Sequence, residues 1–144
     1  MISERERMNV YYGTKRISAE PQIRDGNHGY KVLYEDGYVS WSPRSTFEDC
    51  YRKRGEMNFG HALMALNHGL RLARAEWNGE DQYLFKVTGS TLIVRADQPL
   101  AKSISIGTRV QSDPYIAIKT TDNTIAPWTA SQDDLLAEDW MTVV

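Results

Sequence analysis

The chain has a single cysteine among its 144 residues, Cys50, so no disulfide can form within it. One cysteine is typical of a protein that stays in a reducing compartment. The sequence also lacks any apolar run near the roughly 20 residues that a membrane-spanning helix needs. Its first eight residues, MISERERM, are too polar for the apolar core of a signal peptide. We therefore expect a cytoplasmic protein that has no membrane partner.

A strong excess of either charge is missing as well. The formal net charge is −2 and the pI is about 5.9, so the basic surplus of proteins that coat long nucleic acids is absent. A small nucleotide needs only a few local donors and is not excluded. Hydrophobic residues make up 41% and charged residues 25%, which is the globular range, and the length allows one ordinary core or two small ones.

The motifs of common enzyme classes are also absent. No glycine-rich phosphate loop and no Gly-x-Ser-x-Gly elbow occurs. His61 and His68 are seven residues apart, whereas metal-binding pairs prefer a spacing of three or four. Cys50 has no histidine near it in the sequence, and no pair of carboxylates can be named as acid and base without geometry. We expect no catalytic residue, no metal and no cofactor, and therefore not an enzyme.

The sequence divides into two modules at the charged run Arg52-Lys53-Arg54-Gly55-Glu56. Residues 1–56 predict a β-hairpin around Asp36-Gly37, followed by a helix that starts at Ser42-Pro43. Ser42 is expected to cap the free amides of this helix, and Pro43 suits its first position. Phe47 and Tyr51, four residues apart on this helix, would pack against the hairpin. Earlier in this module we expect strands at Val10–Thr14 and near Arg16–Ala19, and a loop from Pro21 to Gly29.

Residues 57–144 begin with an amphipathic helix. Phe59, Ala62, Leu63 and Leu66 form one apolar stripe, Asn58 caps the start and Gly69 ends the helix. Predicted strands follow at Leu70–Ala75, Tyr83–Val87, Leu92–Val94, Tyr115–Lys119 and Trp140–Val144, with a short helix at Ser131–Glu138. The expected fold class is α+β: the N-terminal hairpin and helix module, then a helix packed on an antiparallel sheet. Trp140 is expected in the core, whereas Tyr83 and Phe85 could face the core or a ligand.

The sequence Trp77-Asn78-Gly79 has two interpretations. An indole beside an amide can stack on a base and read its edge. Alternatively, Asn-Gly forms a turn between strands and the tryptophan covers the core. On the residues alone, the turn is the favoured interpretation.

The segment Pro127-Trp128-Thr129-Ala130-Ser131-Gln132-Asp133-Asp134 also has two interpretations. Ser131 and Asp134 match a capping box, with aspartate in place of the usual glutamate or glutamine. Trp128 and Thr129 would supply a stacking face and a hydroxyl to a ligand at the start of the helix. Four acids lie nearby, so an anionic ligand would require compensation by Arg71, Arg74, Lys119 or a neighbouring subunit.

Four blocks of the second module, taken in order, resemble one known family. They are Met57-Asn58-Phe59-Gly60-His61-Ala62-Leu63, Ala75-Glu76-Trp77-Asn78-Gly79, Tyr115-Ile116-Ala117-Ile118-Lys119-Thr120, and the stretch from Ile125 to Trp140. Together they resemble the second type of Thoeris anti-defence protein, which phages make. Residues 1–56 resemble a short module that recurs in phage genes, through Tyr12-Gly13-Thr14-Lys15 and Gly37-Tyr38-Val39-Ser40-Trp41-Ser42-Pro43.

This resemblance implies a protein that binds cyclic nucleotide signals of bacterial immunity and sequesters them without degrading them. It implies a Thoeris cyclic ADP-ribose isomer as the first ligand, with cyclic dinucleotides in separate pockets of some relatives, and a homotetramer with ligand pockets between subunits. It favours the binding interpretation for Trp77, Asn78 and Trp128, with Thr129, Ser131 and Asp134 as second-rank candidates. The alternatives are a protein–protein interaction module with no nucleotide ligand and a phosphodiesterase-like enzyme.

Overall fold

A computed structural model describes residues 1–77 and 81–144, and its contacts divide the chain into two compact units. Unit 1 spans residues 1–52 and unit 2 spans residues 53–144. Among the described residues, no helix has the length and apolar character that crossing a bilayer requires.

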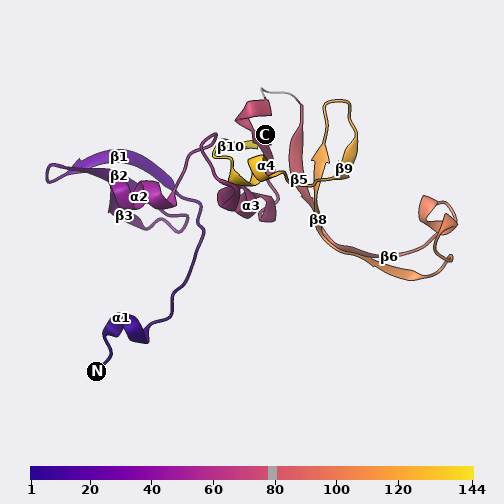
Figure 1. Cartoon of the computed structure of the whole chain (residues 1–144), viewed down its shortest axis with the longest axis horizontal. Helices are drawn as coiled ribbons and strands as arrows, with labels where there is room; N and C mark the ends of the chain where they lie inside the picture. Colours follow the sequence, from indigo (N-terminus) through magenta and orange to yellow (C-terminus); the bar gives the residue numbers. More distant parts are fainter. Residues whose placement is uncertain (78–80) are drawn as a thin grey trace. The chain divides into compact units, whose positions relative to one another are not determined.

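Unit 1 is a three-stranded antiparallel sheet with one helix packed on it (Figure 1). Its elements are α1 (Glu4–Arg7), β1 (Ser18–Arg24), β2 (Asn27–Leu33), β3 (Val39–Pro43) and α2 (Arg44–Cys50). The ring of Phe47 on α2 stacks on Tyr30 of β2 with centroids 4.0 Å apart, and on Tyr51 at 4.9 Å. The predicted hairpin around Asp36-Gly37 and the packing of this helix are therefore confirmed.

Three expectations for unit 1 are wrong. Val10–Thr14 forms no strand: Val10, Tyr11 and Tyr12 are highly exposed, because strand propensity without a partner strand does not hold the backbone. The expected loop at Pro21–Gly29 is largely strand, since Pro21 lies on the edge strand β1, where its missing N–H is tolerated. Residues Asp25 and Gly26, both with positive φ, make the tight turn instead.

The third expectation concerns the start of α2, where serine was expected to cap the helix. Pro43 occupies the N-cap position, and no side chain caps the first turn. The Ser42 hydroxyl instead donates to the carbonyl of Pro43 at 3.4 Å.

Unit 2 is an α+β fold in which helix α3 (Phe59–Asn67) packs on a five-stranded antiparallel sheet, as the sequence predicts. The strand order is β10-β4-β5-β8-β9. The bounds of these strands are β4 (Arg71–Arg74), β5 (Tyr83–Val87), β8 (Tyr115–Lys119), β9 (Ile125–Pro127) and β10 (Trp140–Val143). Asn58 caps α3 by accepting from the amide of His61 at 3.1 Å, and Gly69 follows its end with a φ of 82°. The short helix α4 (Gln132–Leu136) precedes β10.

A two-stranded ribbon continues the hairpin of β5 and β8 beyond the sheet (Figure 1). It consists of β6 (Ser90–Ile93) and β7 (Arg109–Ser112), and a 3₁₀ turn, η2 (Pro99–Lys102), lies near its tip. Gly89 stands at the junction, because a Cβ there would lie 2.6 Å from the carbonyl oxygen of Ser112. The sequence predicted a strand at Leu92–Val94 but not β7.

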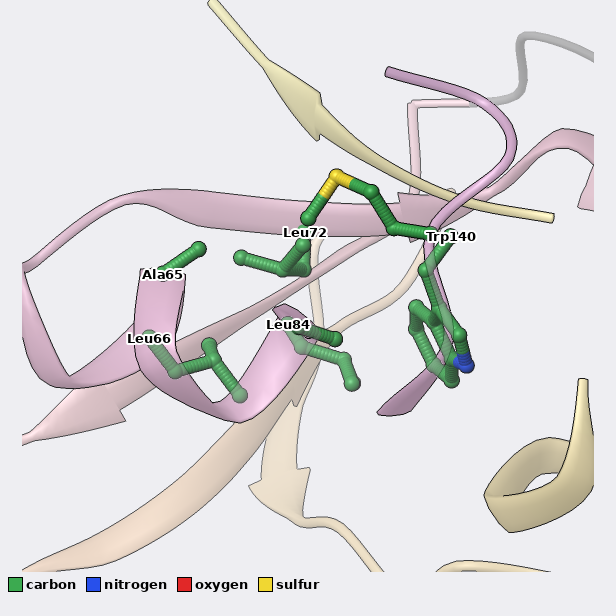
Figure 2. Close-up of a cluster of buried hydrophobic side chains, with 7 residues drawn as sticks. Ala65, Leu66, Leu72, Leu84 and Trp140 are labelled. Atoms are coloured by element: carbon green, nitrogen blue, oxygen red, sulfur yellow. The ribbon is translucent and has the colours of Figure 1, made fainter. Parts of the chain in front are cut away.

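The core of unit 2 lies between α3 and the sheet. Figure 2 shows Ala65 and Leu66 of α3 directed toward Leu72, Leu84 and Trp140 of the strands. Leu72, Leu84 and Trp140 are fully buried. Since side chains alternate along a strand, the neighbours of Leu84 point to the opposite face of the sheet. That assignment places Tyr83 and Phe85, both half-buried, away from α3.

Candidate functional site

Trp140 is the centre of an aromatic cluster in unit 2. It begins β10, is fully buried, and its indole N–H donates to the carbonyl oxygen of Asp134 at 3.0 Å. The rings of Phe59, Trp77 and Trp128 surround it at centroid distances of 5.7, 5.8 and 6.0 Å. All three meet Trp140 edge to face, an arrangement favoured between aromatic rings. We call Phe59, Trp77, Trp128 and Trp140 the tryptophan cluster.

Different segments supply the two tryptophans that the sequence nominated for ligand binding. Trp77 ends the 3₁₀ turn η1 (Ala75–Trp77), which directly follows β4. Trp128 directly follows β9, and its backbone N–H donates to the carbonyl oxygen of Ile116 at 2.9 Å. Both side chains pack against the core yet remain partly exposed. The structure therefore brings both nominated tryptophans to the same buried residue, and each can serve the core with one part and a ligand with another.

The remaining nominated residues differ in what the structure gives them. Asn78 lies outside the described residues. Thr129 is exposed and follows Trp128. Ser131 and Asp134 form the predicted capping box: the Ser131 hydroxyl accepts from the amide of Asp134 at 3.1 Å, and the carboxylate of Asp134 accepts from the amide of Ser131 at 3.4 Å. Their role in starting α4 is confirmed.

Arg74, the last residue of β4, contacts three carboxylates. Its Nε donates to Asp139 at 2.9 Å and its Nη1 to Asp134 at 3.0 Å, while Nη2 lies 2.6 Å from Glu76. The guanidinium is largely buried, and one planar group with five N–H donors can serve all three acids. We call Arg74, Glu76, Asp134 and Asp139 the arginine clamp.

The clamp shifts the pKa of two of its members, Asp139 and Arg74. Burial alone would raise the pKa of the Asp139 carboxyl, but hydrogen bonds from Arg74 and from the amide of Glu76 outweigh it and lower that pKa. Burial lowers the pKa of the Arg74 guanidinium, yet the carboxylates outweigh this effect and raise it. Both groups therefore stay charged at neutral pH. Arg74 thus offsets part of the acidic charge that the sequence placed beside the predicted ligand site.

The other two candidate cations gather elsewhere, around Tyr83. The guanidinium of Arg71 lies 4.9 Å from the centre of the Tyr83 ring, and the ammonium of Lys119 lies 5.6 Å from it. Lys119 also donates to the carboxylate of Asp81 at 2.7 Å. Sequence reasoning missed this grouping, although strand alternation placed Tyr83 and Lys119 on strands that could pair.

The fold and the tryptophan cluster define unit 2 as a small α+β domain with an aromatic cluster around the buried Trp140. Residues 57–143 match the model of the Thoeris anti-defense 2-like domain. A relative, Thoeris anti-defense 2 of Bacillus phage SP01, is 37% identical over 90 residues, which are 59% of this chain and 92% of that protein. The chain therefore belongs to the Thoeris anti-defense 2-like family of phage anti-defence proteins.

Proposed function

We propose that this protein binds cyclic nucleotide signals of bacterial immunity in the host cytoplasm and sequesters them without chemical change. The first ligand is a cyclic ADP-ribose isomer of the Thoeris system, and cyclic dinucleotides are a second class. One observation carries the proposal beyond family membership: Trp77 and Trp128 both pack on Trp140 and both keep exposed surface. Rigid, partly exposed indoles are suited to stacking on a base.

Each site residue has a distinct role in this proposal. Trp77 stacks on the adenine, Asn78 forms hydrogen bonds with the base or a ribose, and Trp128 forms a wall of the pocket. Thr129, exposed beside Trp128, offers a hydroxyl to the ligand. These contacts hold an intact ligand, and the proposal requires no proton transfer or bond cleavage.

Ser131 and Asp134 are secondary candidates for the ligand-binding site. Their capping box holds the start of α4, where backbone amides favour a negatively charged group. The Asp134 carboxylate already has partners at both oxygens, one in the capping box and one in Arg74. Its contribution in this proposal is therefore to fix the helix beside Trp128.

Sequestration acts by mass action. Binding sites must outnumber the signal molecules, and the dissociation constant must lie well below the concentration at which the signal activates its effector. We propose that the chain assembles as a homotetramer with pockets between subunits. The sheet face opposite α3 supports association, because strand alternation places Tyr83 and Phe85 on it and both rings keep exposed surface. Light scattering of the purified protein tests this assembly against a chain mass of 16.5 kDa.

The central experiment incubates the purified protein with the Thoeris cyclic ADP-ribose isomer and separates free ligand by filtration. The bound fraction is then released by heat and identified by mass spectrometry. Depletion from the filtrate with recovery of intact ligand supports sequestration. Recovery of an altered molecule would show an enzyme, and free passage through the filter would refute binding of this ligand. In that case cyclic dinucleotides are the next probe, and capture of a protein partner the one after.

Site assignment is tested with Trp77→Ala against the matched variant Trp41→Ala, which changes a half-buried tryptophan of unit 1. Loss of one base–aromatic stack is worth about 1–3 kcal/mol, so Trp77→Ala should weaken binding by about 5-fold to 150-fold. Trp41→Ala should bind like the parent. Titration calorimetry is performed well below the melting temperature of each variant. Equal affinity of a folded Trp77→Ala variant and the parent would remove Trp77 from the site.

A further inference from the structure

Arg74 connects three segments beside the tryptophan cluster. Its three carboxylate partners come from different elements: Glu76 from η1, Asp134 from α4, and Asp139 from the residue before β10. Two of these acids are sequence neighbours of cluster members, since Glu76 precedes Trp77 and Asp139 precedes Trp140. The third, Asp134, accepts the indole N–H of Trp140 through its backbone carbonyl.

Backbone contacts reinforce the same connection. The carboxylate of Asp139 accepts from the amide of Glu76 at 3.0 Å. The backbone carbonyl oxygen of Asp139 accepts from the amide of Ala75, also at 3.0 Å. The turn that ends in Trp77 is therefore attached to the segment before Trp140 at two backbone positions. Arg74 adds the connection to α4, which neither of these hydrogen bonds supplies.

We infer that Arg74 is a positioning residue for the nucleotide pocket, fixing the Trp77 turn relative to the helix that follows Trp128. This inference rests on the proposed function, because it assigns how the same pocket is kept in its binding geometry. Arginine suits the role because Nε, Nη1 and Nη2 each face a different carboxylate in one plane. The ammonium group of lysine is a single point and cannot span all three acids.

Charge gives Arg74 a second effect on the pocket. Among the described residues, the charged groups within contact of its guanidinium are the carboxylates of Glu76, Asp134 and Asp139. Without the arginine these three negative charges would repel one another and an anionic nucleotide. Loss of Arg74 should therefore both loosen the pocket and make its field more negative.

The test measures calorimetric affinity of the full chain for the Thoeris cyclic ADP-ribose isomer. The variants are Arg74→Lys and Arg74→Met, and the control is Arg95→Met, which breaks an exposed ion pair with Asp97 in the ribbon. We expect Arg74→Lys to bind about 10-fold more weakly and Arg74→Met about 100-fold more weakly, since small misplacements of a site have effects of this size. Arg95→Met should match the parent.

The pH dependence of binding distinguishes the electrostatic effect of Arg74 from a general loss of structure. Removing Arg74 takes away the hydrogen bond and the positive charge that lower the pKa of the Asp139 carboxyl, so Asp139 takes up a proton at a higher pH in Arg74→Met than in the parent. Acidification from pH 7.5 to 5 should therefore relieve the repulsion in Arg74→Met, and its deficit relative to the parent should shrink. A deficit that stays constant over this range would overturn the electrostatic part of the inference.

A milder variant covers the case in which the Arg74 variants do not fold. Glu76 has a largely exposed side chain, so Glu76→Gln should fold normally. It should bind about 3-fold more weakly, because we expect the loss of the ion pair that fixes the Trp77 turn to outweigh the removal of one negative charge. Affinity equal to that of the parent in Arg74→Lys, or in Glu76→Gln if Arg74→Lys is unfolded, would overturn the positioning role alone. A parent protein that binds neither the cyclic ADP-ribose isomer nor a cyclic dinucleotide would refute the proposed function, and the inference with it.

Discussion

Trp140→Phe is the substitution whose effect on stability can be worked most directly from the structure. The change removes the indole N–H that donates to Asp134 at 3.0 Å, which costs about 1 kcal/mol. The smaller ring also leaves a gap in a fully buried site, at a further cost of about 1–2 kcal/mol. The phenyl ring keeps aromatic contacts with Phe59, Trp77 and Trp128, although the contacts made by the outer part of the indole are lost. We expect unit 2 to lose about 2–3 kcal/mol of its free energy of unfolding.

The assay uses the fluorescence of the tryptophans that surround this site. In a Trp41→Phe background, the remaining tryptophans all lie in unit 2, so their emission reports on that unit alone. Thermal unfolding should shift by about 10–20 °C, because 1 kcal/mol moves the midpoint of a domain of this size by about 4–8 °C. Urea unfolding of the same pair gives the free energy without reference to temperature.

The background variant is also the control. Trp41 donates its indole N–H to the carbonyl oxygen of Gln22 at 3.1 Å, so Trp41→Phe loses a comparable hydrogen bond in the other unit. It should leave the unfolding of unit 2 unchanged. A loss below about 0.5 kcal/mol in Trp140→Phe, the range of ordinary surface substitutions, would refute the view that Trp140 organises the cluster.

Three further substitutions or conditions test other parts of the structure. Ser131→Ala removes the cap of α4 and should destabilise unit 2 by about 1 kcal/mol in urea unfolding, whereas an unchanged midpoint would contradict the capping role. Acidification should destabilise unit 2 below about pH 4. The pKa of the Asp139 carboxyl is lower in the folded protein than in the unfolded chain, so the ionised carboxylate stabilises the fold at pH values above the unfolded pKa. This stabilisation is lost as the pH falls through the folded pKa. Asp139→Asn should reduce that acid sensitivity when urea midpoints are compared at pH 7 and pH 3. Gly29→Ala should destabilise unit 1 by about 1–3 kcal/mol, since the new Cβ would lie 2.3 Å from the Ser42 carbonyl oxygen. Gly13→Ala, where a Cβ meets open space, is the matched control. Equal unfolding of the two variants by circular dichroism would contradict this reasoning.

Elements with local signals were predictable from the sequence. Helix α3 combines an apolar stripe with a cap at Asn58, and both features lie within a single short segment. The same holds for the capping box of Ser131 and Asp134. The strand expected at Val10–Thr14 failed for the opposite reason: β propensity is local, whereas the partner strand that would stabilise it is not.

The geometry of the candidate site was less predictable. Sequence reasoning nominated Trp77 and Trp128 through a family resemblance and placed Trp140 in the core, but the meeting of the three rings depends on the folded sheet. Arg74 was one of three cations that, beside a neighbouring subunit, the sequence offered as sources of compensating charge. Its partners Asp134 and Asp139 lie 60 and 65 residues further along the chain, and no periodicity connects positions so far apart.

The ribbon of β6 and β7 is a place where the chain can be lengthened without disturbing the rest of the fold. In the sequence, β6 and β7 lie between β5 and β8, which are neighbours in the sheet. The pairing of β5 with β8 runs from Tyr83–Lys119 to Val87–Tyr115. Residues inserted at the tip therefore need not alter the register of the five-stranded sheet or the position of Trp140. The tip is thus a natural place to insert an epitope tag or a reporter domain without disturbing the core, and a place where related chains can diverge at little cost to folding.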